Sequence, residues 1–173
     1  MSDQLVIRNL TEFDEAELVG LSEVLIDCVR GGASVSFMLP MGLAKAKTYW
    51  REVAISLARG ERIVLVAEVA GVIVGTVQII LAQPENQPHR ADLAKMLVHR
   101  RARQRGVGQA LLVAAEEAAL QAGKTLLVLD TANAEAERLY QRQGWQHCGI
   151  IPGYALLPDG PPCATVIYYK SLD

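Results

Sequence analysis

The hydrophobic positions in the first third of the chain repeat with the period of an α-helix. Apolar residues fall on one helical stripe over residues 12–30 and on another over residues 42–58, and glycines end both stripes. A short apolar run at residues 6–8 is typical of a strand. These patterns predict a strand and two helices, and the helices are joined by the Gly- and Ser-rich segment 31–38.

The pattern changes to that of a sheet in the next part of the chain. Two β-branched runs separated by Ala70 and Gly71 predict a hairpin of largely buried strands. Further apolar runs and helical stripes follow in mixed order, as expected of an α/β fold with a mixed sheet. The predicted elements are strands over 62–69, 72–81, 90–98, 126–129, 145–149 and 164–170 and helices over 106–122 and 133–143. A chain of 173 residues without an internal linker or repeat is expected to form a single domain, 1–173.

Composition and charge exclude several classes of function. The chain is 51% hydrophobic and 21% charged, which is typical of globular proteins, and its formal net charge of −2 gives no basic field for nucleic acid or an anionic membrane. Three cysteines without CxxC spacing and three dispersed histidines indicate neither a disulfide framework nor a metal site. No apolar stretch reaches the roughly 18 residues that span a bilayer, and the first residues have no leader pattern. We therefore expect a cytoplasmic protein without a metal.

A turn that contains glycines precedes the helix predicted over 106–122. Gly106 and Gly108 stand at the mouth of this helix, where backbone N–H groups lack intrahelical acceptors and the helix dipole is positive. Such a turn can bind a phosphate or a pyrophosphate. An ordinary solvated turn would have a similar local sequence, so this pattern alone leaves both interpretations open. Four arginines add positive charge to the turn: Arg100, Arg101, Arg103 and Arg105.

Two motifs resemble those of the GNAT acetyltransferases. Their first motif has Gln or Arg three residues before a Gly, with a second Gly or Ala two residues after it, and Arg103, Gly106 and Gly108 match it. Their second motif has an Asn before a short helix that ends in Gly-Trp, and Asn133 with residues 136–145 match that. The resemblance implies a mostly antiparallel sheet of six to seven strands, flanked by four helices, with a splayed pair of central parallel strands. It also implies that acetyl-CoA or CoA binds to Met96, Leu97, Val98, Arg103, Gln104, Arg105, Gly106, Val107, Gly108, Gln109, Asn133 and Tyr140.

Three side chains are candidates for the chemistry that the resemblance implies. Tyr140 matches a tyrosine that in relatives gives a proton or hydrogen bond to the departing thiolate, although a core aromatic is the other interpretation. Asp92 stands where many relatives place a catalytic Glu, and Asp130 closes the next strand, so each is a candidate for the base that deprotonates the amine. A surface or capping role stays open for both carboxylates. Asn133 can bind pantetheine or cap its helix.

Segments outside these motifs resemble the tabtoxin resistance proteins, which belong to the same family. The similar segments are 31–38, 152–154, 158–160 and 164–170. The resemblance implies a small amino-acid-like toxin as the acceptor, antibiotic resistance as the role, and an acceptor wall formed by Ser34, Ser36, Phe37 and Tyr154. Ordinary turns with Gly or Pro would explain the same segments, so the acceptor stays open.

The motifs and the resemblance together predict an N-acetyltransferase. The expected reaction moves the acetyl group of acetyl-CoA to the primary amine of a small molecule, by direct attack in a ternary complex. The alternative is a module that binds or senses CoA without chemistry. The expected partner is a small-molecule amine, with no nucleic acid and no membrane, and a homodimer stays open.

Overall fold

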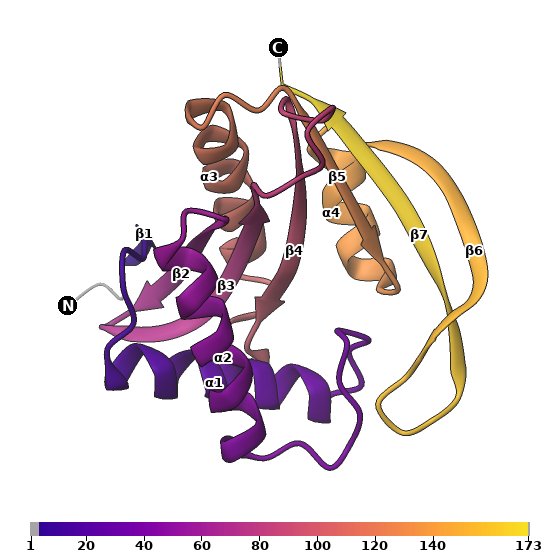
Figure 1. Ribbon diagram of the computed structural model, residues 1–173. Helices are drawn as coiled ribbons and strands as arrows, with labels where there is room; N and C mark the ends of the chain where they lie inside the picture. The colour runs from indigo at the N-terminus through magenta and orange to yellow at the C-terminus, as the bar shows by residue number, and fades with distance from the viewer. Residues whose placement is uncertain (1–3, 173) are drawn as a thin grey trace.

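A seven-stranded sheet lies at the centre of the structure, a computed structural model that describes residues 4–172. Its strands have the order β1-β2-β3-β4-β5-β7-β6, and β4 and β5 form the parallel pair among them (Figure 1). The predicted mixed, mostly antiparallel sheet with four helices is confirmed. The strands are β1 (Leu5–Asn9), β2 (Arg62–Val69), β3 (Val72–Ile80), β4 (Arg90–Val98), β5 (Leu126–Thr131), β6 (Gln146–Leu156) and β7 (Pro162–Ser171). The helices are α1 (Glu15–Arg30), α2 (Leu43–Ala58), α3 (Val107–Gln121) and α4 (Ala134–Arg142), with a short 3-10 helix, η1 (Arg100–Ala102).

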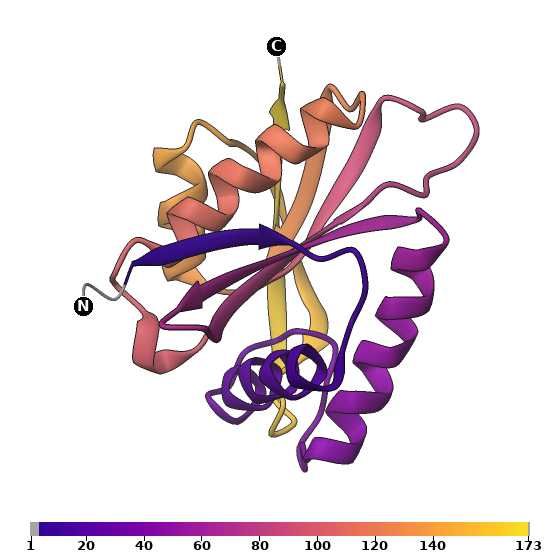
Figure 2. The same ribbon diagram turned by 90° about the vertical axis from the view of Figure 1, so that its left-hand side faces the viewer.

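The helices cover both faces of the sheet. Helices α3 and α4 pack on one face, and α1 and α2 pack on the other (Figure 2). The core under α3 includes Leu111 and Leu127, and the core under α1 and α2 includes Leu21 and Trp50. Strands β3 and β4 contribute side chains to both cores, so residues on both of their faces are buried.

Strand β4 contains a bulge that changes which face its side chains meet. Thr76 and Gln78 of β3 are two positions apart and pair with Leu97 and Ala94 of β4, which are three positions apart. Strand β4 therefore has one extra residue here. Leu93 consequently belongs to the core under α3, whereas Leu97 belongs to the core under α1 and α2. Lys95 lies inside the bulge and has a positive φ of 51°.

Two features differ from the sequence predictions. Strand β6 continues to Leu156, through the stretch around Pro152 that the sequence predicts as a loop. Because β6 lies at the edge of the sheet, a proline there can face solvent without removing a ladder bond, and the register shifts between Ile151 and Ala155. The second feature is η1, which no hydrophobic period indicates.

Candidate active site

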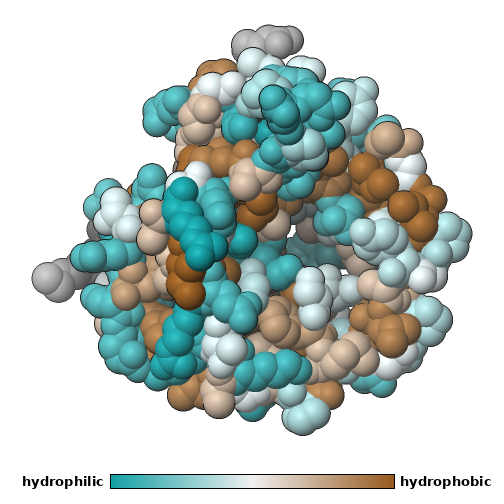
Figure 3. Space-filling model, viewed as in Figure 1, coloured by the Kyte–Doolittle hydropathy of each residue, from teal (hydrophilic) through white to brown (hydrophobic). Residues whose placement is uncertain are grey.

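Strands β4 and β5 separate toward their carboxyl ends and open a cavity between them. Their parallel pairing ends at Asp92 and Val128, although β4 continues to Val98 and β5 to Thr131. Figure 1 shows the two strands diverging, and Figure 3 shows the same face of the molecule hollowed. The cavity has a volume of about 620 Å³, which is within the usual range for small-molecule sites. The unpaired backbone of β4 can hydrogen-bond an extended ligand as a further strand would.

The first turn of α3 presents free N–H groups to this cavity. Its N-cap, Gly106, has a φ of 77°, a conformation that glycine adopts without steric cost. No side chain caps the helix, and its first amides have no acceptor within it. This geometry suits an anion such as a diphosphate. Gly108 has a packing role as well, because an added Cβ would lie 3.2 Å from Leu139 Cδ2 of α4.

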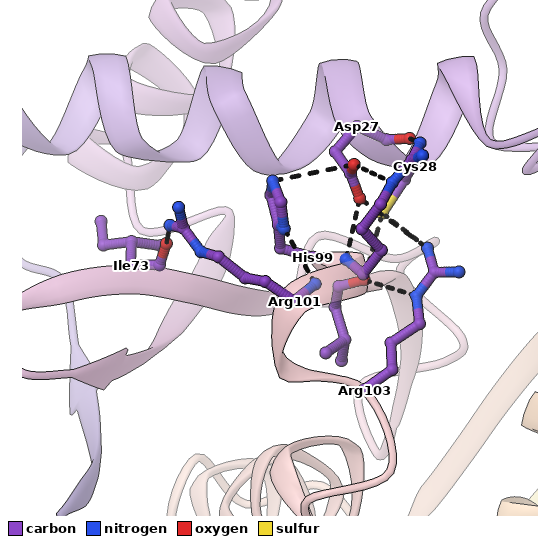
Figure 4. Close-up of polar contacts among 8 residues, drawn as sticks. Asp27, Cys28, Ile73, His99, Arg101 and Arg103 are labelled. Carbon is purple, nitrogen blue, oxygen red and sulfur yellow. Dashed lines mark hydrogen bonds and ion pairs between the residues drawn. The ribbon is translucent and has the colours of Figure 1, made fainter. Parts of the chain in front are cut away.

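Most of the arginines in the preceding turn are held by neighbouring protein groups (Figure 4). For Arg105 no hydrogen-bond or ion-pair partner is found within residues 4–172, and it lies outside the cavity lining. The sequence suggests four cations around an anion, whereas in the structure three of them fix the shape of the turn. The contacts are Arg100 with the Asp27 carboxylate, Arg101 with the Ile73 carbonyl at 3.3 Å, and Arg103 with the Val98 carbonyl at 3.0 Å.

Asp27 joins this turn to the end of α1. Its carboxylate accepts the backbone N–H of Arg100 at 2.9 Å and lies 3.7 Å from Nε2 of His99 and 4.0 Å from Nη2 of Arg103 (Figure 4). Burial raises the pKa of Asp27, but the hydrogen bonds from Arg100 outweigh it and hold the pKa below its ordinary value. Since α1 ends only a few residues later and leads into segment 31–36, the same helix end supports two walls of the cavity.

Tyr140 has a buried ring and a hydroxyl that is free of protein partners. The residue is 3% exposed, and its ring centroid lies 5.7 Å from that of Trp145 and 6.0 Å from that of Tyr168. Tyr140 also lines the cavity, and no described residue is hydrogen-bonded to its hydroxyl. Burial, and then the negative charge of Asp130, raise the pKa of this phenol, so it stays protonated near neutral pH. The ring is therefore part of the core, and the hydroxyl is left as a donor.

Asn133 caps helix α4. Its Oδ1 accepts hydrogen bonds from the backbone N–H groups of Glu135 at 2.8 Å and Ala136 at 3.0 Å. Asn133 also lines the cavity, and its Nδ2 donates to no described residue. Of the two interpretations open in the sequence, the structure establishes the cap and leaves the amide nitrogen for a ligand.

The two candidate bases have different positions. Asp130 lies at the end of β5 in the cavity lining, and its Oδ2 accepts a hydrogen bond of 2.7 Å from Oγ1 of Thr165. Asp92 lies in the paired part of β4, outside the cavity lining, and its carboxylate is engaged by Arg90 and by a glutamine side chain. The structure thus brings Asp130, but not Asp92, together with Tyr140.

Two of the four residues predicted to bind the acceptor line the cavity, and two do not. Ser34 and Ser36 line the cavity, and Ser34 Oγ lies 3.5 Å from Sγ of Cys163 in β7. Phe37 instead packs edge-on against an α2 tyrosine, with ring centroids 5.1 Å apart. Tyr154 is 56% exposed on β6. Neither aromatic residue is part of the cavity lining.

The residues predicted to bind the cofactor come together at one site. Arg105 is the exception. The others line the same cavity: Met96, Leu97, Val98, Arg103, Gln104, Gly106, Val107, Gly108, Gln109, Asn133 and Tyr140.

Several polar residues of the site are missing from the sequence predictions, among them Lys95 and Thr165. Lys95 lines the cavity from the β4 bulge and donates a hydrogen bond of 3.0 Å to Oγ of Ser36. A charged residue between the apolar residues Ala94 and Met96 was the signal that could have identified it. Thr165 reaches Asp130 only through the register of β7 on β5, which no local pattern reveals.

Membrane-spanning helices and metal-binding clusters are both missing from the described residues. No helix within residues 4–172 combines the length and the apolar character needed to cross a bilayer. The same part of the chain contains no group of three or more His, Cys, Asp or Glu side chains placed to hold a metal ion.

The splayed strands, the amide turn and the buried tyrosine all line one cavity. The model of the acetyltransferase (GNAT) family matches residues 36–145, a segment that contains all three features. This match spans more than half of the chain, so the chain belongs to the GNAT acetyltransferase family. Members of this family transfer an acetyl group from acetyl-CoA.

Proteins with similar sequences or structures are also acetyltransferases. An uncharacterized N-acetyltransferase from the hisH-hisA intergenic region of Azospirillum brasilense is 29% identical over 133 residues, which cover 76% of this chain and 77% of the relative. The ribosomal-protein-alanine N-acetyltransferase of Brucella melitensis is 25% identical with a TM-score of 0.79, covering 96% of this chain and 99% of that one. The structure of yncA from Salmonella typhimurium, with its cofactor acetyl-CoA, has a TM-score of 0.79 at 19% identity, covers 98% of this chain and 95% of that one, and supports the fold.

Proposed function

We propose that this acetyltransferase acetylates the primary amine of a small, amino-acid-like molecule by direct attack within a ternary complex. The observation that carries the proposal is a single cavity lined by the unpaired edge of β4, the amide turn of α3 and Tyr140. A thioester and an amine can meet there without a covalent enzyme intermediate, since proximity and orientation supply much of the rate enhancement.

The cavity residues suit coenzyme A. The amides at the start of α3, beside Gly106, would hold the diphosphate at the positive end of the helix dipole. The backbone of residues 96–98 would pair with the amide groups of pantetheine, and Nδ2 of Asn133 would donate to one of their carbonyls. This placement puts the thioester end of the molecule toward Tyr140, deeper between the strands.

The side chains beside Tyr140 can manage the protons of the reaction. Asp130, oriented by Thr165, would accept a proton from the ammonium group of the acceptor, directly or through water. The amine nitrogen then forms a bond to the thioester carbonyl carbon, and the C–S bond breaks. Tyr140 would give its hydroxyl proton to the departing thiolate, and the proton that the new amide nitrogen loses would restore the phenol through solvent.

The acceptor end of the cavity favours a small molecule. Segment 31–36 contacts β7 through Ser34 and Cys163. Just beyond it, the Leu39 N–H donates to the Pro158 carbonyl at 2.9 Å. These contacts form one wall of the acceptor end, which favours an acceptor small enough to lie within the cavity. The segments similar to tabtoxin resistance proteins lie here, and an amino-acid toxin falls within the proposed class.

A thiol-release assay tests the proposal. Acetyl-CoA is mixed with the protein and a panel of free amino acids, which includes diamino acids and β-lactam amino acids. We expect release of free CoA thiol with at least one of them and an N-acetylated product by mass spectrometry. Binding of CoA without thiol release would instead indicate a sensing module, and preference for a peptide with N-terminal alanine would contradict the small-molecule acceptor.

A further inference from the structure

Two residues with unusual backbone conformations meet in the cavity. Lys95 in the β4 bulge has a φ of 51°, and Ser36 in the loop after α1 has a φ of 80°. Positive φ costs free energy for any residue other than glycine, and such outliers cluster at functional sites. The two side chains are joined by a hydrogen bond of 3.0 Å from Nζ of Lys95 to Oγ of Ser36. The fold therefore holds a lysine side chain at this point of the cavity against local backbone preference.

The ammonium group of Lys95 lacks a counter-ion in contact with it. An ammonium carries three N–H donors, and one of them is used by Ser36. Within residues 4–172 no carboxylate oxygen lies within 4.0 Å of this nitrogen. The pKa of Lys95 lies below its ordinary value. Burial is the main cause of this shift, the charge of Asp130 opposes it, and the charge of Arg62 adds to it. A half-buried cation with free donors in a cavity is suited to bind an anionic group of a ligand.

Arg62, the arginine whose charge acts on Lys95, is not available to bind a ligand. Arg62 donates from Nε to Oγ of Ser56 at 2.8 Å and from Nη1 to Oε1 of Gln78 at 2.6 Å. It also lies outside the cavity lining, so its charge adds to the positive field without contacting a ligand. Among the cations of the cavity lining, which also include Arg103 and Arg142, Lys95 is the one hydrogen-bonded to segment 31–36 on the acceptor side.

The cavity also contains a negative group, the carboxylate of Asp130. Asp130 lines the same cavity, close enough for its charge to act on both Lys95 and Tyr140. The acceptor region accordingly has a carboxylate near the proton donor and an ammonium toward segment 31–36. A molecule that carries one amine and one carboxylate has the complementary charges.

We propose that Lys95 binds the carboxylate of the acceptor and is the residue that selects amino acids over other primary amines. The inference rests on the proposed function and names the feature of the substrate that its site recognises. The carboxylate accepts hydrogen bonds from Nζ of Lys95, with Ser36 as a second donor, while the amine lies beside Asp130. A neutral or purely cationic amine leaves Lys95 without its anion.

Paired substrates test this assignment by kinetics. Acetyl transfer is measured with free α-amino acids and with the corresponding amino-acid amides, which lack the carboxylate charge. We expect Lys95→Met to lower kcat/KM about 30- to 1,000-fold for the acids, mostly through KM, and to change it less than about threefold for the amides. Lys95→Arg keeps the charge and is expected to keep part of the preference. An equal loss for acids and amides would overturn the inference.

A binding measurement separates this inference from the proposed function. Calorimetry in the presence of CoA, which cannot acetylate, compares the affinities of the same acids and amides for the wild-type protein and for Lys95→Gly. Glycine accepts the positive φ, so this variant is expected to fold with equal or greater thermal stability and still lose the preference for acids. Wild-type protein that prefers acids but releases no thiol would refute only the proposed function. Thiol release with equal affinity for acids and amides would refute only the role of Lys95.

Discussion

The hydroxyl of Thr165 on β7 donates a hydrogen bond of 2.7 Å to Oδ2 of Asp130 on β5. Thr165 is 3% exposed, whereas Asp130 is exposed at the cavity wall, so a buried hydroxyl orients a carboxylate that solvent and ligands can reach. Helix α4 places Tyr140 at the same wall. The proposed acceptor and donor of protons are therefore positioned by two separate elements, and the charge of Asp130 acts on the Tyr140 phenol.

Replacement of Asp130 by Asn tests its role as the base. The amide cannot accept a proton from the acceptor, so kcat/KM is expected to fall by about 100-fold or more in a thiol-release assay. Thr165→Val keeps the carboxylate but removes its hydrogen bond, and we expect a loss of about tenfold. Asp92→Asn is the matched control, because that carboxylate lies outside the cavity lining. A larger loss in the control than in Asp130→Asn would reverse the assignment.

Tyr140→Phe tests the proton donor. The ring packing is retained and the hydroxyl has no described protein partner, so the free energy of unfolding should change little while kcat falls by about 100-fold or more. The KM for acetyl-CoA should stay within about twofold, since the phenol acts on the departing thiolate. Turnover at the wild-type rate would leave Tyr140 with a packing role alone.

Tyr168→Phe is the control for Tyr140→Phe, because it is expected to affect stability rather than the rate of acetyl transfer. This hydroxyl accepts a hydrogen bond from Gln141 and donates one to Glu137, and each bond is 3.0 Å long. Its removal should lower the free energy of unfolding by about 1 to 2 kcal/mol in a urea titration. The rate of acetyl transfer should change much less than in Tyr140→Phe, because Tyr168 lies outside the cavity lining.

Local patterns predicted the elements well because the central strands and helices are marked by burial. The run predicted over 90–98 matches β4 (Arg90–Val98), because its apolar residues pack into the cores on both faces of the sheet. Strand β6 was predicted less well. Its exposed edge position permits Pro152 within a strand, so the usual signal for a loop was misleading.

Partners distant in the sequence limited the prediction of the site. The sequence suggests Arg100 as a phosphate ligand, but in the structure it binds Asp27, which is 73 residues earlier in the chain. Asp92 and Asp130 likewise look equivalent, because the point at which β4 and β5 separate depends on strand pairing and not on local sequence. Lys95 was missed since a bulge, rather than strand alternation, sets its direction. Residues of the amide turn were predictable because the glycine spacing is itself local.

A matched pair of variants at Gly106 tests the amide turn. Gly108 is less suitable for this purpose, because a large side chain there would collide with Leu139. Gly106→Asp and Gly106→Asn have similar shapes and similar backbone strain, but the aspartate brings a negative charge to the site of the diphosphate. We expect the Kd for CoA, measured by calorimetry, to be about 10- to 100-fold higher for Asp than for Asn. Equal affinities would place the diphosphate elsewhere.

Asp27→Asn tests how the turn is held to α1, through the dependence of stability on pH. The folded-state pKa of Asp27 lies below its ordinary value of about 3.9. Its ionised form therefore stabilises the fold above about pH 4, and this contribution is lost as the pH falls through the folded pKa. In urea titrations near pH 7 we expect the variant to lose about 1 to 3 kcal/mol relative to wild type, and the difference to shrink below about pH 4. The exposed Asp159→Asn serves as the control and should show no such difference; a gap for Asp27→Asn that stays constant down to pH 3 would mean that packing, rather than charge, fixes the turn.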